Sequence, residues 1–431
     1  MKTVLYSAAC CAALTLHAGA RAQSPGAELR ILGMLPDYPR GAGFALSDDA
    51  GVIVGMVANS DVTRFHGVRW DSKGRLSLMP GEPERPTKPN NVSPDGRLIV
   101  GWAVPPGTSI AHPALWRDGV LEVLPMLPNS WQGIPEAISD DGRVIVGDAK
   151  LPHTSPYSGL VRWVDGKVED LSRTPGEATP FSGADVDAVG RYIVGGGFAG
   201  FIRATRVDTL QRYVRDLGNL PGVAGGDYDA PGIDGTGLRV VGSGASLNSP
   251  TSGEAFLWSA PTGMVGLGTP PYFPYCSGAS AIARRLPVVA GEDCTRDSYF
   301  YLAFLWDPVR GKRYVNDILD ALGVDRRGYT INNINDISPD GTLMTGIARR
   351  GFTDDRPAFL VRLPPWCWAD CTGDDVVDFS DLLCFLNRFE RAQDPRANPI
   401  DFFYCDLAPD DEIDFNDFLA FLNLYNKGCG E

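Results

Sequence analysis

The stretch Ile138–Gly147 reads ISDDGRVIVG and decides how the chain is interpreted. Adjacent aspartates before a glycine are typical of half a metal site or an acid/base pair, but equally of a tight turn that enters an apolar strand. Similar segments are LSDDAGVIVG from Leu46, VSPDGRLIVG from Val92, VDAVGRYIVG from Val186, IDGTGLRVVG from Ile233, IARRLPVVAG from Ile282 and ISPDGTLMTG from Ile337. The aspartates vary among these copies while the apolar strand persists. We therefore interpret them mainly as turn residues.

The seven copies start 46, 46, 48, 47, 49 and 55 residues apart, a period typical of propeller blades. Each period holds four short strand candidates, which are clearest in the second copy as PNNVS, RLIVGWA, HPALWR and VLEVLPMLP. Glycine-containing turns follow the first and third of them, as in an antiparallel meander. The sequence therefore predicts a mainly β fold, a seven-bladed β-propeller of four-stranded antiparallel blades.

A tryptophan recurs at the end of the third predicted strand in five copies. These residues are Trp70, Trp116, Trp163, Trp258 and Trp306. A large ring at one fixed place per repeat buries much apolar area, so we expect it to pack between blades rather than to bind a ligand.

The two ends of the repeat region predict a closed ring. The last copy stops after its third strand, AFLVRLPP, whereas LRILGMLP from Leu29 resembles the fourth strands of other copies. We expect a strand at Arg30 to Leu35 to complete the last blade, which removes exposed sheet edges. The alternative, a linear solenoid, would need capping repeats.

The pattern S-x-D-G-x-x-x-V-G, then H-A-F-x-W, then D-L-G-x-L-P-G resembles the extracellular HAF repeats of exported bacterial proteins. The resemblance covers Leu29 to about Pro365. It implies a propeller-like secreted repeat protein and no established activity.

The N-terminus and the charge distribution divide the chain into three parts. Residues 1–22 have a lysine, a short apolar run and an A-x-A site, which predicts a signal peptide and a secreted or cell-surface protein. Residues 23–365 carry 38 acidic and 33 basic residues and form the propeller, with no basic field for nucleic acid. Residues 366–431 hold 15 acidic and 4 basic residues, a balance of −11 out of −14 for the chain, and form a separate unit. No later segment is apolar enough to span a membrane.

The acidic tail contains two loops with the spacing of calcium ligands, each before a predicted helix. In the first loop, positions 1, 3, 5, 7, 9 and 12 are Asp370, Thr372, Asp374, the Val376 carbonyl, Asp378 and Asp381. In the second, weaker loop, positions 1, 5, 9 and 12 are Asp406, Asp410, Asp414 and Asp417. Ala408 removes one ligand from the second loop, and both loops carry aspartate at position 6 where glycine is usual. We expect calcium at the first loop more than at the second.

These twinned loops, their F-L-N helices and the terminal Gly-Cys resemble the GC-type dockerin-like modules of exported bacterial proteins. The resemblance covers Cys367 to Cys429 and implies a small α-helical, EF-hand-like domain. It implies attachment to a cohesin-like receptor or another surface protein, and not catalysis. The alternative is a small folded cap without a partner.

Cysteine positions suggest two disulfides. Cys276 and Cys294 flank a predicted hairpin, and Cys367 and Cys429 bracket the tail. Cys371, Cys384 and Cys405 leave one thiol over, which the sequence does not assign.

No catalytic motif of a metalloprotease, serine hydrolase or phosphate-binding enzyme is present. We therefore expect a non-enzymatic binding role, and the alternative is a propeller-type carbohydrate hydrolase that uses a carboxylate pair. Long variable loops on one propeller face favour a glycan or protein ligand there. Its candidate residues are Tyr272, Phe273, Tyr275 and Tyr299. A local minicore under the loops is the alternative interpretation of these aromatics.

Overall fold

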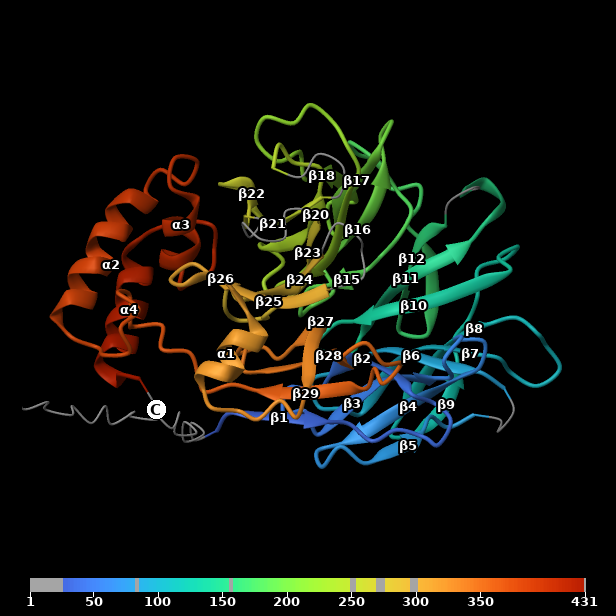
Figure 1. The fold of residues 1–431 in the computed structure, drawn as a ribbon. Helices are drawn as coiled ribbons and strands as arrows, with labels where there is room; N and C mark the ends of the chain where they lie inside the picture. The colour runs from blue at the N-terminus through green and yellow to red at the C-terminus, as the bar shows by residue number, and fades with distance from the viewer. Residues whose placement is uncertain are drawn as a thin grey trace, which may run out of the picture.

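Seven antiparallel sheets are arranged as blades in a ring, and a helical tail lies at one side (Figure 1). The computed structural model describes residues 26–81, 85–154, 158–248, 253–268, 276–294 and 301–429. Every blade is a meander whose first strand is innermost, which confirms the predicted seven-bladed propeller.

Blade 1 consists of β2 (Arg40–Leu46), β3 (Val52–Ala58), β4 (Phe65–Asp71) and β5 (Leu76–Leu78). Blade 2 consists of β6 (Thr87–Val92), β7 (Leu98–Ala103), β8 (His112–Arg117) and β9 (Val120–Val123). Blade 3 consists of β10 (Gln132–Ile138), β11 (Val144–Lys150), β12 (Gly159–Val164) and β13 (Lys167–Asp170). Blade 4 consists of β14 (Thr179–Pro180), β15 (Asp185–Val186), β16 (Tyr192–Phe198), β17 (Ile202–Asp208) and β18 (Tyr213–Asp216). Blade 5 consists of β19 (Tyr228–Ile233), β20 (Val240–Gly244), β21 (Glu254–Ser259) and β22 (Gly263–Gly266). Blade 6 consists of β23 (Cys276–Ile282), β24 (Val289–Cys294), β25 (Tyr301–Asp307) and β26 (Gly311–Tyr314). Blade 7 consists of β27 (Tyr329–Ile337), β28 (Leu343–Arg350), β29 (Ala358–Arg362) and the N-terminal strand β1 (Glu28–Ile31).

The ring closes through the N-terminal strand, as predicted. Strand β1 pairs with β29, from Glu28 opposite Arg362 to Ile31 opposite Phe359. The strand lies earlier than the expected Arg30 to Leu35. The chain leaves blade 7 after Leu32, because the N–H of Gly33 donates to the Gly74 carbonyl of blade 1 at 2.9 Å.

The acidic turn of the opening stretch is held by its own side chains. Ser139 Oγ donates to Asp141 Oδ1 at 2.6 Å and accepts the N–H of Val144 at 3.0 Å. Asp141 Oδ1 also accepts the N–H of Arg143 at 3.0 Å. The second aspartate of this pair therefore closes the turn.

The repeated tryptophans are packing residues, as predicted. All five are at most 4% exposed. The indole N–H groups of Trp70, Trp116 and Trp163 each donate at 2.7 Å to a carbonyl just beyond the preceding blade's outer strand. Each ring therefore fills the interface between two blades.

An unpredicted helix explains the longest repeat spacing. Helix α1 (Val315–Ala321) follows the outer strand of blade 6 and buries Val315 and Leu319 against the core of blades 6 and 7. It occupies the extra residues of the 55-residue interval.

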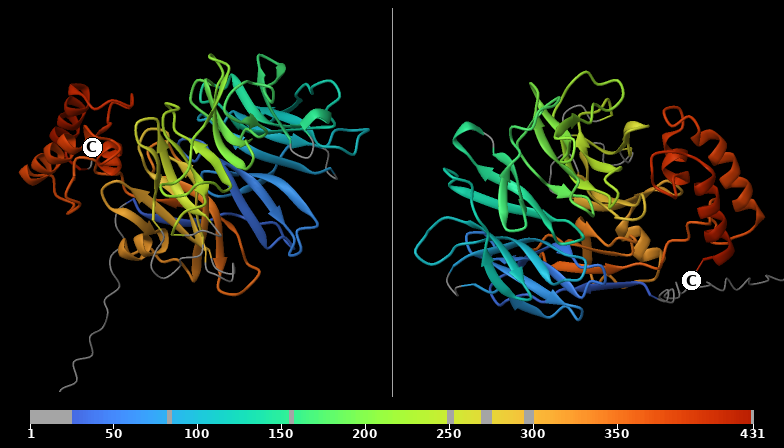
Figure 2. Two further views of the ribbon diagram at one scale, coloured as in Figure 1. Left: turned by 90° about the horizontal axis from the view of Figure 1, so that it is seen from above. Right: turned by 180° about the vertical axis from the view of Figure 1, so that it is seen from behind.

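The tail forms α2 (Phe379–Ala392), α3 (Pro399–Cys405) and α4 (Phe415–Lys427), and lies beside blades 5 and 6 in all views (Figure 2). Phe385 of α2 and Phe421 of α4 stack with ring centroids 3.8 Å apart. Helix α3 was not predicted; its Phe402 and Phe403 belong to the propeller core formed by blades 5 and 6. The tail is thus packed onto the propeller. Among the described residues, no helix is long and apolar enough to cross a membrane.

Three disulfides are present in the described part of the chain. Cys276–Cys294 and Cys367–Cys429 confirm the two suggested pairs. The pair Cys371–Cys384 links the first loop to α2, so the buried Cys405 is the free thiol that the sequence left unassigned.

Candidate binding channel and anchoring loops

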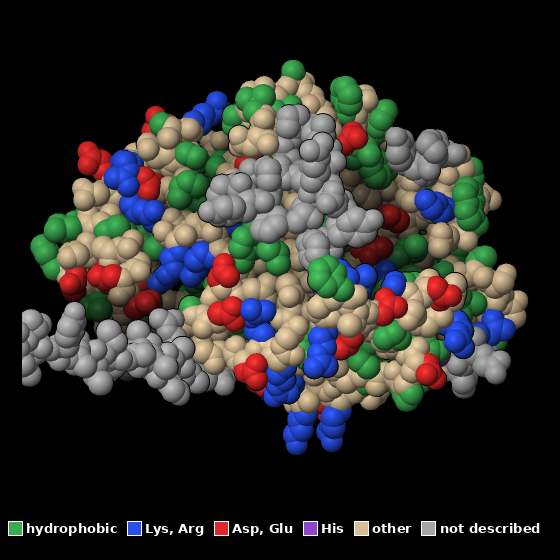
Figure 3. All heavy atoms as spheres, viewed as in Figure 1, with side chains coloured by type: hydrophobic (Ala, Val, Ile, Leu, Met, Phe, Trp, Pro, Cys, Tyr) green, Lys and Arg blue, Asp and Glu red, His purple; other side chains and the backbone are tan. Residues whose placement is uncertain are grey.

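β-Bulges direct side chains into a central cavity of about 470 Å³ that is lined by residues from all seven blades. A bulge inserts one residue that has no partner in the neighbouring strand and re-aims its side chain. The single bulged residues of the inner strands that line the cavity are Phe44, Asn90, Glu136, Ser280 and Asn335. Acidic side chains are visible at the bottom of a recess in Figure 3.

Several polar side chains in this channel link neighbouring blades. Asn90 Nδ2 donates to the Pro135 carbonyl at 2.8 Å, and Asn335 Nδ2 donates to the Gly43 carbonyl at 2.8 Å. Asp336 accepts the N–H of Leu46 at 2.8 Å. These groups therefore stabilise the ring as well as line the cavity.

Arg284 crosses one end of the channel. It follows the inner strand of blade 6, and its Nε lies 3.4 Å from Asp140 Oδ1 of blade 3. Its Nη2 lies 3.5 Å from Asp185 Oδ1, and its Nη1 donates to the Val186 carbonyl at 2.7 Å. Burial acts to lower the pKa of Arg284, but the charges of Asp185 and Asp140 outweigh burial and the pKa is raised. The guanidinium thus balances the carboxylates at this end.

Elsewhere in the channel, Asp148 lies near enough to Glu136 for its charge to act on the Glu136 carboxyl group. Burial, and then the charge of Asp148, raise the pKa of Glu136 to about 7. Burial raises the pKa of Asp148 to about 6, although its carboxylate accepts the N–H of Gly183 at 3.1 Å. Near neutral pH the pair can both donate and accept hydrogen bonds.

The channel residues were not predicted, although the sequence contains a signal for them. One position, two residues before the last apolar residue of the inner strand, carries four residue types in five regular blades. The residues are Phe44, Asn90, Glu136, Ser280 and Asn335. The flanking turn and strand are nearly constant. A position whose residue type varies, inside a repeat that otherwise stays nearly constant, therefore indicated residues that face a ligand.

The four aromatics proposed from the sequence, Tyr272, Phe273, Tyr275 and Tyr299, lie outside the described residues. The Cys276–Cys294 disulfide at the edge of both loops is present. The aromatic site therefore stays a prediction.

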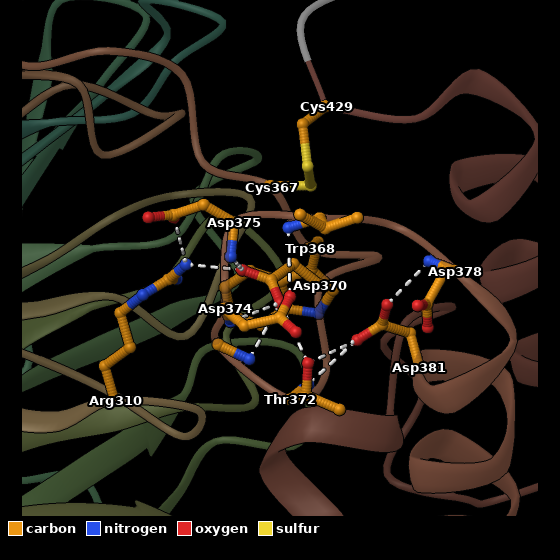
Figure 4. Close-up of a disulfide and its surroundings, with 12 residues drawn as sticks. Arg310, Cys367, Trp368, Asp370, Thr372, Asp374, Asp375, Asp378, Asp381 and Cys429 are labelled. Carbon is orange, nitrogen blue, oxygen red and sulfur yellow. Dashed lines mark hydrogen bonds and ion pairs between the residues drawn. A yellow bond between two sulfur atoms is a disulfide. The ribbon is translucent and has the colours of Figure 1, made fainter.

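The first tail loop wraps around Asp370 (Figure 4). Asp370 Oδ1 accepts the N–H groups of Gly373 and Asp374 at 2.7 and 3.0 Å. Thr372 Oγ1 lies 3.0 Å from Asp381 Oδ1 and 3.5 Å from Asp370 Oδ1, so positions 1, 3 and 12 converge.

Two other predicted ligands of the first loop, Asp374 and Asp378, accept backbone hydrogen bonds instead. Asp374 Oδ1 accepts the N–H of Val376, and Asp378 Oδ1 accepts the N–H of Ser380 at the start of α2. Among the described residues, no group of three or more His, Cys, Asp or Glu side chains is arranged to hold a metal ion.

Both loops make the sharp turn at position 6 with aspartate. Asp375 has φ 66° and Asp411 has φ 67°, a left-handed conformation that aspartate tolerates better than most residues. In the first loop the backbone makes the turn of a calcium loop without glycine, and three of the predicted oxygen donors, Asp370, Thr372 and Asp381, lie together.

The second loop fits calcium poorly. Ala408 offers no side-chain oxygen, although its N–H donates to Asp417 Oδ1 at 2.8 Å, as Thr372 does in the first loop. Asp410 donates its N–H to Asp406 Oδ1 at 3.2 Å, and Asp414 caps α4. The other oxygen of Asp406 is bonded to an arginine of the propeller.

Each of the two long tail helices exposes apolar side chains on one of its faces. Phe379 and Phe415, at equivalent positions of α2 and α4, are both 65% exposed. Leu383, Leu386 and Leu419 are also exposed. These side chains lie away from the Phe385–Phe421 contact, because positions i, i+4 and i+7 share one helix face. We call Phe379, Leu383, Leu386, Phe415 and Leu419 the apolar tail face.

No protein-family model and no curated protein sequence matches this chain. Solved structures that resemble it are propellers. The β-propeller domain of the Trilobed protease from Pyrococcus furiosus shares 11% identity over 79% of this chain and 94% of that chain, with a TM-score of 0.49. An oligogalacturonate lyase from Vibrio parahaemolyticus shares 11% over 80% and 99%, with a TM-score of 0.49. TolB from Acinetobacter baumannii shares 14% over 74% of this chain, which spans 65% of TolB, with a TM-score of 0.42. These likenesses concern the fold alone.

Proposed function

We propose that this is an exported, non-enzymatic binding protein whose propeller presents a ligand site and whose tail anchors it to a cell-surface protein. The apolar tail face carries the anchoring part of the proposal. Large apolar side chains that gather on an exposed surface mark interaction sites. Here they recur at equivalent positions of two helices.

The charge of the tail indicates the chemistry of the receptor surface that it would bind. The tail carries a balance of −11, so a cohesin-like or other receptor should have an apolar centre with basic residues around it. The propeller buries a different side of the tail, the one that contains α3, so the apolar tail face is available to such a receptor.

The anchoring experiment compares full-length wild type with the double variant Phe379→Ser and Phe415→Ser. Binding to chelator-washed cell surfaces of the producing organism should fall at least about tenfold, because the two most exposed aromatic side chains of this surface lose their apolar area. Leu210→Ser, which removes a 74% exposed leucine from the propeller, is the matched control and should bind normally. Unchanged binding by the double variant would exclude this face as the anchor.

We further propose that calcium orders the first loop. Asp370, Thr372, Asp374, Asp378, Asp381 and the Val376 carbonyl would hold it. When bound, calcium would offset the repulsion among the loop carboxylates and stabilise the folded tail by mass action.

Calcium should raise the melting temperature of the full chain. Asp374→Ala together with Asp378→Ala should remove most of that rise, whereas Asp414→Ala should remove less, because the second loop already lacks a ligand at Ala408. An equal melting temperature with calcium and with chelator would refute calcium ordering.

For the propeller, a neutral carbohydrate is the ligand that the channel favours. Asn91 and Ser182 line the cavity with Glu136, whose pKa of about 7 lets it donate or accept, and Phe44 adds an aromatic surface. Glycan-array binding followed by calorimetry should show at least about tenfold weaker binding for Phe44→Ala. Leu78→Ala on an outer strand is the control. Retained affinity in Phe44→Ala would exclude the channel.

A specific observation also favours the second candidate, a carbohydrate hydrolase. Glu136, with a pKa of about 7, lies beside the more acidic Asp148 in one cavity, as an acid and its partner carboxylate do in glycosidases. Release of reducing ends from a polysaccharide panel, lost in both Glu136→Gln and Asp148→Asn, would establish this activity. Binding without release would leave the non-enzymatic proposal in place.

A further inference from the structure

Two arginines of the propeller approach the second tail loop. Arg239, which precedes β20 of blade 5, is 2% exposed, and its Nη2 donates to Asp406 Oδ2 at 2.9 Å and to the Asp406 carbonyl at 2.6 Å. Arg206 of β17 lies near enough to Asp411 for its charge to act on that carboxyl group.

The buried Arg239 guanidinium provides Asp406 with the positive charge that a bound metal cation would provide. Asp406, at position 1, is 2% exposed and has both its Oδ2 and its carbonyl bonded to one guanidinium. Position 3 is Ala408, so the loop lacks one ligand. A divalent ion would also be repelled by Arg239 and Arg206.

We infer that the second loop is a latch that binds the Arg239 guanidinium in place of calcium and fixes the tail to blade 5. The full chain then takes up one calcium ion, at the first loop. Only the stoichiometry rests on the proposed calcium site; the latch itself does not.

The packing around the latch agrees with this role. Asp406 directly follows α3, whose Phe402 and Phe403 are buried in one cluster with Leu257 and Trp306 of the propeller. The Arg239–Asp406 ion pair therefore lies at the end of the apolar interface between α3 and the propeller. Because breaking a buried pair leaves an uncompensated charge, the latch should be sensitive to single substitutions on either side.

The first loop offers a matched comparison within the same molecule. Arg310 of the propeller donates to Asp370 Oδ2 at 2.7 Å, but its side chain is 21% exposed and also contacts the exposed Asp375 at 3.2 Å. This loop keeps an oxygen ligand at position 3, Thr372. Arg310 is thus an accessory contact on a loop that retains its ligands.

The first experiment counts calcium. Native mass spectrometry of the full chain, stripped with chelator and then supplied with calcium, should show one bound ion. It should show none in the variant Asp374→Ala with Asp378→Ala. Two ions in wild type would overturn the replacement of calcium by Arg239. No ion in wild type would refute the calcium proposal, and the latch would then be judged by the second experiment alone.

The second experiment measures the latch without any metal. In chelator, hydrogen exchange of the α3 amides should be at least about tenfold faster in both Arg239→Gln and Asp406→Asn than in wild type. The double variant should be no faster than Arg239→Gln alone, because that substitution already removes the pair with Asp406, together with the 3.9 Å contact between Arg239 and Asp234. Arg310→Gln should leave α3 protected. Unchanged exchange in both single variants, with native circular dichroism, would overturn the latch.

Discussion

Arg284 of blade 6 and Asp140 of blade 3 meet across the channel, with Nε of the arginine 3.4 Å from Oδ1 of the aspartate. Three blade positions separate the two residues around the ring. The contact therefore ties opposite sides of the propeller together at the end where the acidic turns gather.

Replacing Arg284 by Met should destabilise the propeller by about 3 kcal/mol, because Asp140 and Asp185 would lose the cation that they face. Urea unfolding at pH 8 measures the effect. Arg285→Met is the control, since the neighbouring Arg285 side chain is 73% exposed and should matter little. Equal losses for the two variants would contradict a special role for Arg284.

Replacing Glu136 by Gln should change how stability depends on pH. The pKa of Glu136 in the folded protein, about 7, lies above its ordinary value of 4.5. The proton is held more tightly in the folded state, so this stabilisation is complete below about pH 4 and is lost as the pH rises through 7.

Relative to wild type, Glu136→Gln should therefore raise the free energy of unfolding by about 3 kcal/mol at pH 8 and by less than about 1 kcal/mol at pH 5. Denaturant titrations at the two pH values provide the measurement. Glu122→Gln, on an exposed outer strand, serves as the control. A difference that is the same at both pH values would show that Glu136 titrates normally.

Deleting residues 28–31 should open the ring, because β29 would lose the partner that covers its outer edge. We expect a lower melting temperature and concentration-dependent light scattering. An excess of a peptide spanning residues 26–36 should restore both properties. A deletion variant that stays monomeric with an unchanged melting temperature would show that closure is not needed.

Cys405 should be the one thiol that becomes reactive on unfolding. It is 0% exposed, and burial raises the pKa of its thiol, so the reactive thiolate is scarce in the folded protein. In a chain that starts at residue 23, a thiol reagent should titrate no cysteine in the native state and one in guanidinium chloride without reductant. A reactive thiol under native conditions would mean that one of the three disulfides is open.

The repeat period, the turns and the tryptophans made the blades predictable, because each uses local chemistry that recurs seven times. The closing strand was predictable from the displaced copy, but its limits depended on Gly33 bonding to Gly74, which lies 41 residues away. The channel was not predicted, since Glu136 and Asp148 become neighbours only through a bulge and a second strand. Nor could Arg239 be linked to Asp406, 167 residues later, without the docked tail.

The place where the tail leaves the propeller has a mechanical consequence. The tail follows β29, which is an interior strand of blade 7, hydrogen-bonded to β28 on one side and to β1 on the other. If the tail is tethered and drag on the propeller separates it from blade 5, the pulling force then acts along a strand that is paired on both sides. The strand pairs must then slide past each other together, which resists force better than peeling one edge strand bond by bond. The N-terminal strand would thus serve as the clamp that lets this ring withstand tension at its anchor.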